Sequence, residues 1–197
     1  DVYKRQAYDG AIVVAERNTI SGAAEGSGFG IRSSTVTANS NIIGPIGGWN
    51  GLWIYGTSDV VAENNTIQDT AKEAVLIGEY HYLDQGWNVP TPTAARLYLA
   101  NNQISNNTGT CNSQMYGGDF PCPAIHVFMS SATLYDNTVT NNGGDGMRIK
   151  ASIVNAQRNT IEVSGFAANV SLFDDNYGNK YGSIAYFSEN TYTNATQ

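Results

Sequence analysis

The 197-residue sequence has few charged residues, only two cysteines and no long apolar segment. Charged side chains make up 14% of the chain, and the Glu, Lys and Leu excess of helical proteins is missing. No segment approaches the roughly 18 consecutive apolar residues of a membrane-spanning helix, so we expect no membrane insertion. The net charge of −7 argues against nucleic acid and against an anionic membrane surface as partners. What remains is rich in Gly, Asn, Ser and Thr, as in turn-rich β proteins.

An eight-residue motif, typified by Val-Val-Ala-Glu-Asn-Asn-Thr-Ile, recurs seven times along the chain. Its aligned asparagines are Asn18, Asn41, Asn65, Asn102, Asn137, Asn159 and Asn190. Three of their six separations are 22 to 24 residues, and the others are 37, 35 and 31. A period of this size predicts a solenoid in which each repeat forms one coil.

Apolar residues alternate within each motif, which predicts a strand, and the asparagine marks a bend before a second strand. Asparagine suits this bend because it tolerates the left-handed backbone region. At a coil spacing of about 4.8 Å the amides would stack into a hydrogen-bonded ladder. A third strand precedes most motifs and usually follows a glycine. Its expected inward pairs are Phe29/Ile31, Leu52/Ile54, Val75/Ile77, Ile125/Val127, Met147/Ile149 and Val170/Leu172.

Three short strands per repeat predict a triangular coil whose strands pair in parallel with those of the neighbouring coils. The pattern Gly-apolar-x-apolar-x-Ser followed by Val-x-Ala-x-x-Asn-Thr-Ile resembles the right-handed parallel β-helix of the pectate lyase-like superfamily, over about residues 10–195. The resemblance implies an all-β fold of about seven coils in one domain, but no particular activity. An antiparallel sandwich or barrel is the alternative, although such folds do not repeat one motif at near-constant spacing.

The two ends of the sequence predict a fragment of a longer chain. Residues 1–6 match neither the repeat nor a targeting signal, and we expect them to be foreign to the natural protein. The chain stops just after the seventh motif, so flanking coils of the same parent chain would be its neighbours. Unpaired strands at the ends would favour association.

Insertions interrupt the period at residues 79–95, 107–122 and 174–183. They fall at the corners beside the glycine-led strands and would rise as walls around that face; loop drift without function is the alternative. Both cysteines, Cys111 and Cys122, lie in the second insertion. A disulfide between them would stabilise the loop by about 3 kcal/mol and would indicate an extracellular, periplasmic or cell-surface location. Two free thiols are the alternative, and no metal site is predicted.

The outward residues of the glycine-led strands form the candidate site. Aromatic rings there would stack on a sugar, while cations would hold a carboxylate or sulfate. Candidates for substrate binding are Trp53, Tyr55, Glu73, Tyr80, His81 and Asp145, and candidates for catalysis are His126, Arg148 and Lys150. Each has an ordinary alternative, since aromatic residues pair across strands and Arg148 or Lys150 could pair with Glu73 or Asp145.

Residues 137–152, which end in Arg148-Ile149-Lys150, also resemble polygalacturonase-type glycoside hydrolases. In that family the Arg-Ile-Lys motif binds the substrate carboxylate, which implies this role for Arg148 and Lys150. The family's three aspartates are missing, because Trp49-Asn50 and Lys72-Glu73 stand in their place. One carboxylate is left where inverting hydrolysis requires a pair, so we do not expect hydrolysis.

A lyase would need less, namely one base and one cation. We expect no cofactor, although Asp119, Asp145, Asp174 and Asp175 could supply oxygen ligands to Ca²⁺ if the loops converge. The sequence therefore predicts a module that binds or processes an acidic polysaccharide or surface glycan on one sheet face. A structural stalk, adhesin or surface-layer segment is the alternative.

Overall fold

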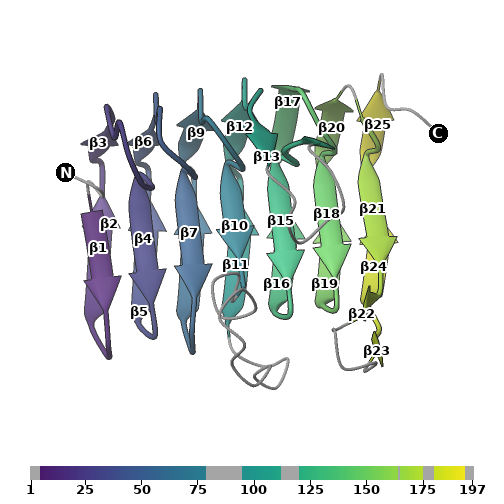
Figure 1. Ribbon diagram of the computed structural model, residues 1–197, viewed down its shortest axis with the longest axis horizontal. Coiled ribbons are helices and arrows are strands. Elements are labelled where there is room, and N and C mark those ends of the chain that lie inside the picture. The colour runs from purple at the N-terminus through teal and green to yellow at the C-terminus, as the bar shows by residue number, and fades with distance from the viewer. Residues whose placement is uncertain (1–4, 79–94, 112–119, 164, 175–179, 194–197) are drawn as a thin grey trace.

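The computed structural model is a β-helix of seven coils and describes residues 5–78, 95–111, 120–163, 165–174 and 180–193 (Figure 1). Each coil contributes one strand to each of three seven-stranded parallel sheets, named here sheets A, B and C. The predicted all-β solenoid with three strands per coil is confirmed.

Sheet A contains β1 (Arg5–Tyr8), β4 (Phe29–Arg32), β7 (Leu52–Tyr55), β10 (Val75–Ile77), β15 (Ile125–Phe128), β18 (Met147–Lys150) and β21 (Ala168–Ser171). Sheet B contains β2 (Ile12–Glu16), β5 (Thr35–Asn39), β8 (Asp59–Glu63), β11 (Arg96–Ala100), β16 (Ser131–Tyr135), β19 (Ile153–Gln157) and β24 (Ile184–Ser188). Sheet C contains β3 (Thr19–Ile20), β6 (Ile42–Ile43), β9 (Thr66–Gln68), β12 (Gln103–Ser105), β17 (Thr138–Asn142), β20 (Thr160–Val163) and β25 (Thr191–Thr193).

In the described part of the chain, two antiparallel hairpins lie outside the coils, both within predicted insertions. The hairpin of β13 (Thr110–Cys111) and β14 (Phe120–Pro121) belongs to the second, and that of β22 (Phe173–Asp174) and β23 (Lys180–Tyr181) to the third. Most of the first insertion, with Tyr80 and His81, lies outside the described residues. Among the described residues, no helix has the length and apolar character needed to cross a membrane.

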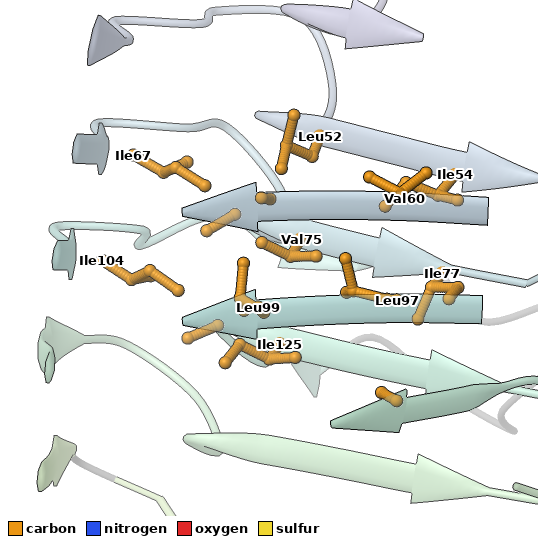
Figure 2. Packing of buried hydrophobic residues seen from close by; sticks show 14 of the residues in the cluster. Leu52, Ile54, Val60, Ile67, Val75, Ile77, Leu97, Leu99, Ile104 and Ile125 are labelled. Carbon is orange, nitrogen blue, oxygen red and sulfur yellow. The ribbon is translucent and has the colours of Figure 1, made fainter. Parts of the chain in front are cut away.

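Equivalent residues of successive coils lie directly above one another, so the inward side chains form one apolar column (Figure 2). In sheet A, Val75 pairs with Leu52 on one side and with Ile125 on the other. Leu99 of sheet B and Ile104 of sheet C fill the same column, and all of these side chains are buried.

The inward pair predicted for the last coil is wrong, because it lies two residues too far along the chain. Val170 pairs with Ile149 and Ala168 with Met147, so the inward pair is Ala168/Val170 rather than Val170/Leu172. Leu172 lies beyond the strand and is 54% exposed. The apolar alternation through Leu172 fits both registers, and Gly165 does not directly precede this strand as Gly146 precedes β18. Arg5 and Gln6, predicted to lie outside the repeat, begin the first strand of sheet A.

The asparagine ladder forms as predicted and runs through all seven coils. Typically, the side-chain oxygen of Asn102 accepts hydrogen bonds from both the backbone N–H (2.8 Å) and the side-chain amide (2.9 Å) of Asn65. The Asn102 amide in turn donates to the Asn137 side chain at 3.0 Å and to the Ala62 carbonyl oxygen at 2.9 Å. Asn102 therefore ties three coils together.

The left-handed backbone conformation predicted for the ladder asparagines belongs instead to the residue before each of them. These seven residues are Arg17, Ser40, Asn64, Asn101, Asp136, Arg158 and Glu189, with φ between 52° and 56°. The bend accepts varied residue types there, whereas the next position needs a side chain that both donates and accepts. Asparagine recurs for its hydrogen bonds and not for its backbone preference.

We predict that Asn102→Ala lowers the free energy of unfolding by about 2–5 kcal/mol, measured by urea denaturation. The substitution leaves two buried donors of Asn65 without their acceptor, and each costs about 1–3 kcal/mol. Asn101→Gly is the control, because this exposed neighbour has φ 56°, which glycine adopts readily. Equal losses for the two variants would contradict the ladder's role.

Candidate functional site

Sheet A brings the three residues predicted as catalytic onto neighbouring strands. In the register of β15 and β18, His126 lies beside Arg148 and Phe128 beside Lys150. Glu73 and Asp145 precede two strands of the same sheet, as predicted. Regular pairing between coils therefore assembles this cluster from residues far apart in the sequence.

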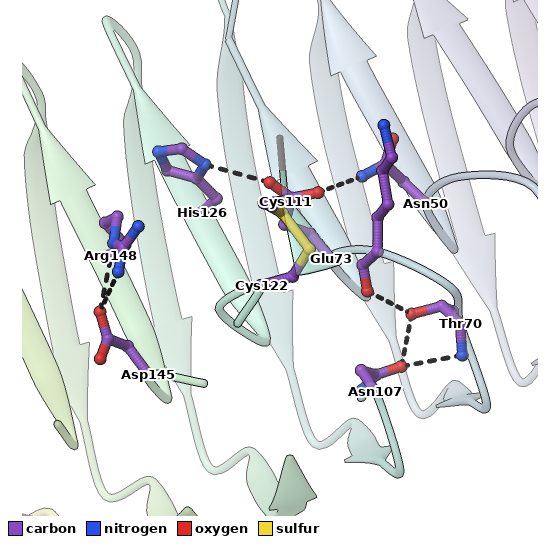
Figure 3. The surroundings of a disulfide bond; sticks show 10 residues. Asn50, Thr70, Glu73, Asn107, Cys111, Cys122, His126, Asp145 and Arg148 are labelled. Carbon is purple, nitrogen blue, oxygen red and sulfur yellow. Dashed lines mark hydrogen bonds and ion pairs between the residues drawn. A yellow bond between two sulfur atoms is a disulfide. The ribbon is translucent and has the colours of Figure 1, made fainter. Parts of the chain in front are cut away.

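His126 and Glu73 form a buried polar pair beneath this face (Figure 3). His126 Nδ1 lies 3.4 Å from Glu73 Oε1, and the Asn50 side-chain amide donates to Glu73 Oε2 at 2.8 Å. The Ser27 hydroxyl, one coil further along, contacts the Asn50 side-chain oxygen at 3.4 Å. His126 has no solvent-exposed surface, although its position in the strand is an outward one. It is therefore held by the protein and not presented to a ligand in solution.

Arg148 is fixed by an ion pair with Asp145, which is the alternative to ligand binding that the sequence left open. Its guanidinium donates two hydrogen bonds to Asp145 Oδ2, at 2.7 and 3.1 Å (Figure 3). It also lies 4.1 Å from the centre of the Phe120 ring. Asp145 also accepts from the Phe166 backbone N–H at 3.1 Å. The charge of Arg148 is thus largely balanced within the protein, while part of the side chain stays accessible.

Lys150 is half-buried and lies two residues beyond Arg148, on the same face of β18. Burial lowers the pKa of its ammonium group below the usual value, and the positive charge of Arg148 lowers that pKa further. An amine in this state is easier to deprotonate than an ordinary lysine, and it would gain from a bound anion.

The predicted sugar platform of Trp53 and Tyr55 is an internal aromatic stack. Their ring centres are 4.4 Å apart with an interplanar angle of 20°, and Trp49 meets Trp53 edge-on at 5.8 Å. Trp53 is only 4% exposed, so the accessible part of this cluster belongs to Trp49 and Tyr55.

The predicted disulfide between Cys111 and Cys122 is present (Figure 3). It links the end of β13 to the residue that follows β14 and so closes the base of the hairpin. Both cysteines are buried, and the Glu73 carboxylate lies beside them. The bond is compatible with an extracellular or otherwise oxidising environment.

An open groove on the outer face of sheet B was not predicted. It has a volume of about 510 Å³ and crosses β11, β16, β19 and β24. Tyr98 and Tyr186 line it at its two outer strands, with Thr133 and Asn155 between them. The sequence pattern that indicates this groove is the shared third position of these residues in successive sheet B strands. The insertions lie beside sheet A, and the site was therefore predicted there.

A second, shorter ladder of Thr70, Asn107 and Asn142 also went unpredicted. The Thr70 hydroxyl donates to the Asn107 side-chain oxygen at 2.6 Å. The Asn107 backbone N–H in turn donates to the Asn142 side-chain oxygen at 3.1 Å. Its signal was the Asn-Asn pairs at 106–107 and 141–142, which share the 35-residue separation of the main ladder. This ladder anchors the start of the second insertion.

Compared with known protein families, with curated proteins and with solved structures, the chain has no match. The likeness to the pectate lyase-like superfamily and to polygalacturonases therefore stays a prediction from sequence motifs. The fold and the contacts described above are the basis for a functional proposal.

We predict that the Lys150 ammonium titrates below the ordinary lysine value of about 10.4, as followed by NMR. Because its folded-state pKa is depressed, the unfolded chain binds more protons between the two pKa values, so stability should rise with pH there. Lys150→Met should remove that rise.

Arg148→Gln should return only the smaller part of the Lys150 shift, since burial is its larger cause. A Lys150 pKa equal to that of the unfolded chain would contradict the described environment.

Proposed function

We propose that this protein is a non-catalytic, glycan-binding β-helix module that holds a polysaccharide in the groove of sheet B. The observation that carries the proposal is the open groove of about 510 Å³ between Tyr98 and Tyr186. Ligand sites are typically concave and largely apolar with a few polar groups, and this groove has that composition.

The side chains of the groove suit sugar rings. A pyranose has apolar faces that stack on aromatic rings and hydroxyl groups that need hydrogen-bonding partners. Tyr98 and Tyr186 are 37% and 65% exposed and offer ring faces, while Thr133 and Asn155 offer polar atoms between them. The two tyrosines stand three strands apart, about 14 Å at the usual spacing, so the groove accommodates more than one sugar unit.

The charge of the groove favours a neutral glycan. Arg96 is the basic residue that lines the groove, and it forms an ion pair with Asp59, which also lines the groove, at 2.7 Å. Ile153, which is exposed, adds apolar surface. A non-catalytic role is supported by the burial of His126 and by the ion pair that occupies Arg148.

We predict that the double variant Tyr98→Ala/Tyr186→Ala weakens glycan binding by about 5- to 150-fold, because each aromatic contact contributes about 0.5–1.5 kcal/mol. Binding to neutral polysaccharides would be measured by affinity electrophoresis and calorimetry. Tyr55→Ala, which removes an aromatic residue from sheet A, is the control and should bind like the unaltered protein.

If the unaltered protein retains no neutral glycan, or the double variant binds as well as the Tyr55 variant, the proposal is wrong. Failure to retain any glycan would favour a structural stalk, adhesin or surface-layer role for the coils.

A second candidate function is the binding of an acidic polysaccharide on sheet A. It is favoured by the adjacent, partly accessible Arg148 and Lys150. Burial first and the charge of Arg148 second lower the Lys150 pKa, and an anion between the two cations would offset the repulsion between them. This is the site that the sequence predicts, with Trp53, Tyr55 and His126 now as supporting residues. Both candidate functions would operate outside the cytosol.

For this candidate we predict that Arg148→Ala/Lys150→Ala abolishes retention on uronate or sulfated polymers, while Tyr98→Ala/Tyr186→Ala does not. Binding should also weaken with added salt, because exposed charges are screened. Release of unsaturated products from a uronate polymer would show lyase activity at sheet A. Equal retention of the unaltered and cation-free proteins would eliminate this site.

A further inference from the structure

Three side chains with metal-binding atoms meet beneath the β13–β14 hairpin. One ligand atom each from Glu73, Cys111 and Cys122 lies within 4.8 Å of the other two, and all three residues are buried. Neither proposed glycan surface uses this cluster. Its members come from the entry of β10, from β13 and from the segment before β15.

The chemistry of this cluster depends on the oxidation state of its sulfurs. In the disulfide, neither sulfur is a thiolate, and the cluster offers only the carboxylate. A thiol or phosphine reductant supplies two electrons, and two protons from solvent complete two thiols. Two thiolates beside a carboxylate are a ligand set typical of Zn²⁺, which prefers sulfur, nitrogen and oxygen donors at about 2.0–2.3 Å.

The Glu73 carboxylate is already held in place for such a role. Asn50 donates to Oε2 at 2.8 Å, and His126 Nδ1 lies 3.4 Å from Oε1. Hydrogen-bonding partners of this kind orient the carboxylate ligands of metal sites. A buried carboxylate that two polar partners hold in place therefore lies beside the two sulfurs.

We propose that reduction of the Cys111–Cys122 disulfide creates a binding site for a thiophilic divalent cation such as Zn²⁺. Cys111, Cys122 and Glu73 are its ligands, and His126 is a positioning residue for the carboxylate. Binding breaks two S–H bonds, forms two metal–sulfur bonds and releases two protons to solvent. The metal replaces the disulfide as the link between the two ends of the hairpin, so the fold is retained in both oxidation states.

The test is a Co²⁺ and Zn²⁺ titration of the full chain with and without a phosphine reductant. The reduced protein should bind one equivalent of Co²⁺ with thiolate-to-metal charge-transfer absorption and release of two protons. Zn²⁺ should then displace the Co²⁺ without further proton release. The oxidised protein should show neither signal. Glu73→Gln should weaken binding at least about tenfold, and His126→Asn should weaken it by about 10–100-fold.

Glu63→Gln, an acidic residue of sheet B distant from the cluster in the fold, is the matched control and should leave binding unchanged. Cys111→Ser/Cys122→Ser should abolish the charge-transfer band. Far-UV circular dichroism follows folding in parallel. Reduction that unfolds the chain, with recovery on adding Zn²⁺, would support the site.

Three results would overturn the proposal. In the first, the reduced protein binds Co²⁺ no more tightly than the double serine variant does. In the second, Glu73→Gln leaves the Co²⁺ affinity unchanged. In the third, the reduced chain unfolds and stays unfolded when Zn²⁺ is added. None depends on glycan binding, so the proposed function and the metal site can fail separately.

Discussion

A side-chain amide can be buried only if its donors and acceptor all find partners, and here the adjacent coils supply them. Each inner asparagine accepts from the backbone and side chain of one neighbour and donates to the next, as Asn65 does with Asn41 and Asn102. A shift of one residue between coils would break these hydrogen bonds in the buried interior, where an unpaired group costs about 1–3 kcal/mol. The ladder therefore fixes the register of all three sheets.

A fixed register decides which side chains become neighbours. Ser27, Asn50 and Glu73 precede the sheet A strands of successive coils, so they stack into a polar row in the same way as the ladder asparagines. On the fifth coil Pro123 takes this position, and His126, the second residue of β15, reaches Glu73 instead. The buried pair is thus a consequence of coil stacking, interrupted at one proline.

The periodic features of the sequence predicted the periodic features of the fold. Spacing and alternation were sufficient for the coils, the ladder and most inward pairs, while two cysteines in one insertion were sufficient for the disulfide. The accessibility of His126 and Trp53 was beyond such reasoning, because alternation says which way a side chain points and not what covers it. Residues Val170 and Leu172 show a second limit, since two registers satisfied the same apolar pattern.

The two outer faces differ in how much of their chemistry is already engaged. On sheet A, His126 and Arg148 make contacts within the protein, and a ligand would have to compete with them. Leaving a buried polar group without its partner costs about 1–3 kcal/mol. A single stacked aromatic contact usually contributes less, about 0.5–1.5 kcal/mol. On sheet B, Tyr186 and Asn155 are exposed beside an open groove, so a ligand that stacks on them there does not have to break a buried contact. This difference in cost, and not the number of candidate residues, is the reason for proposing sheet B rather than sheet A as the glycan-binding face.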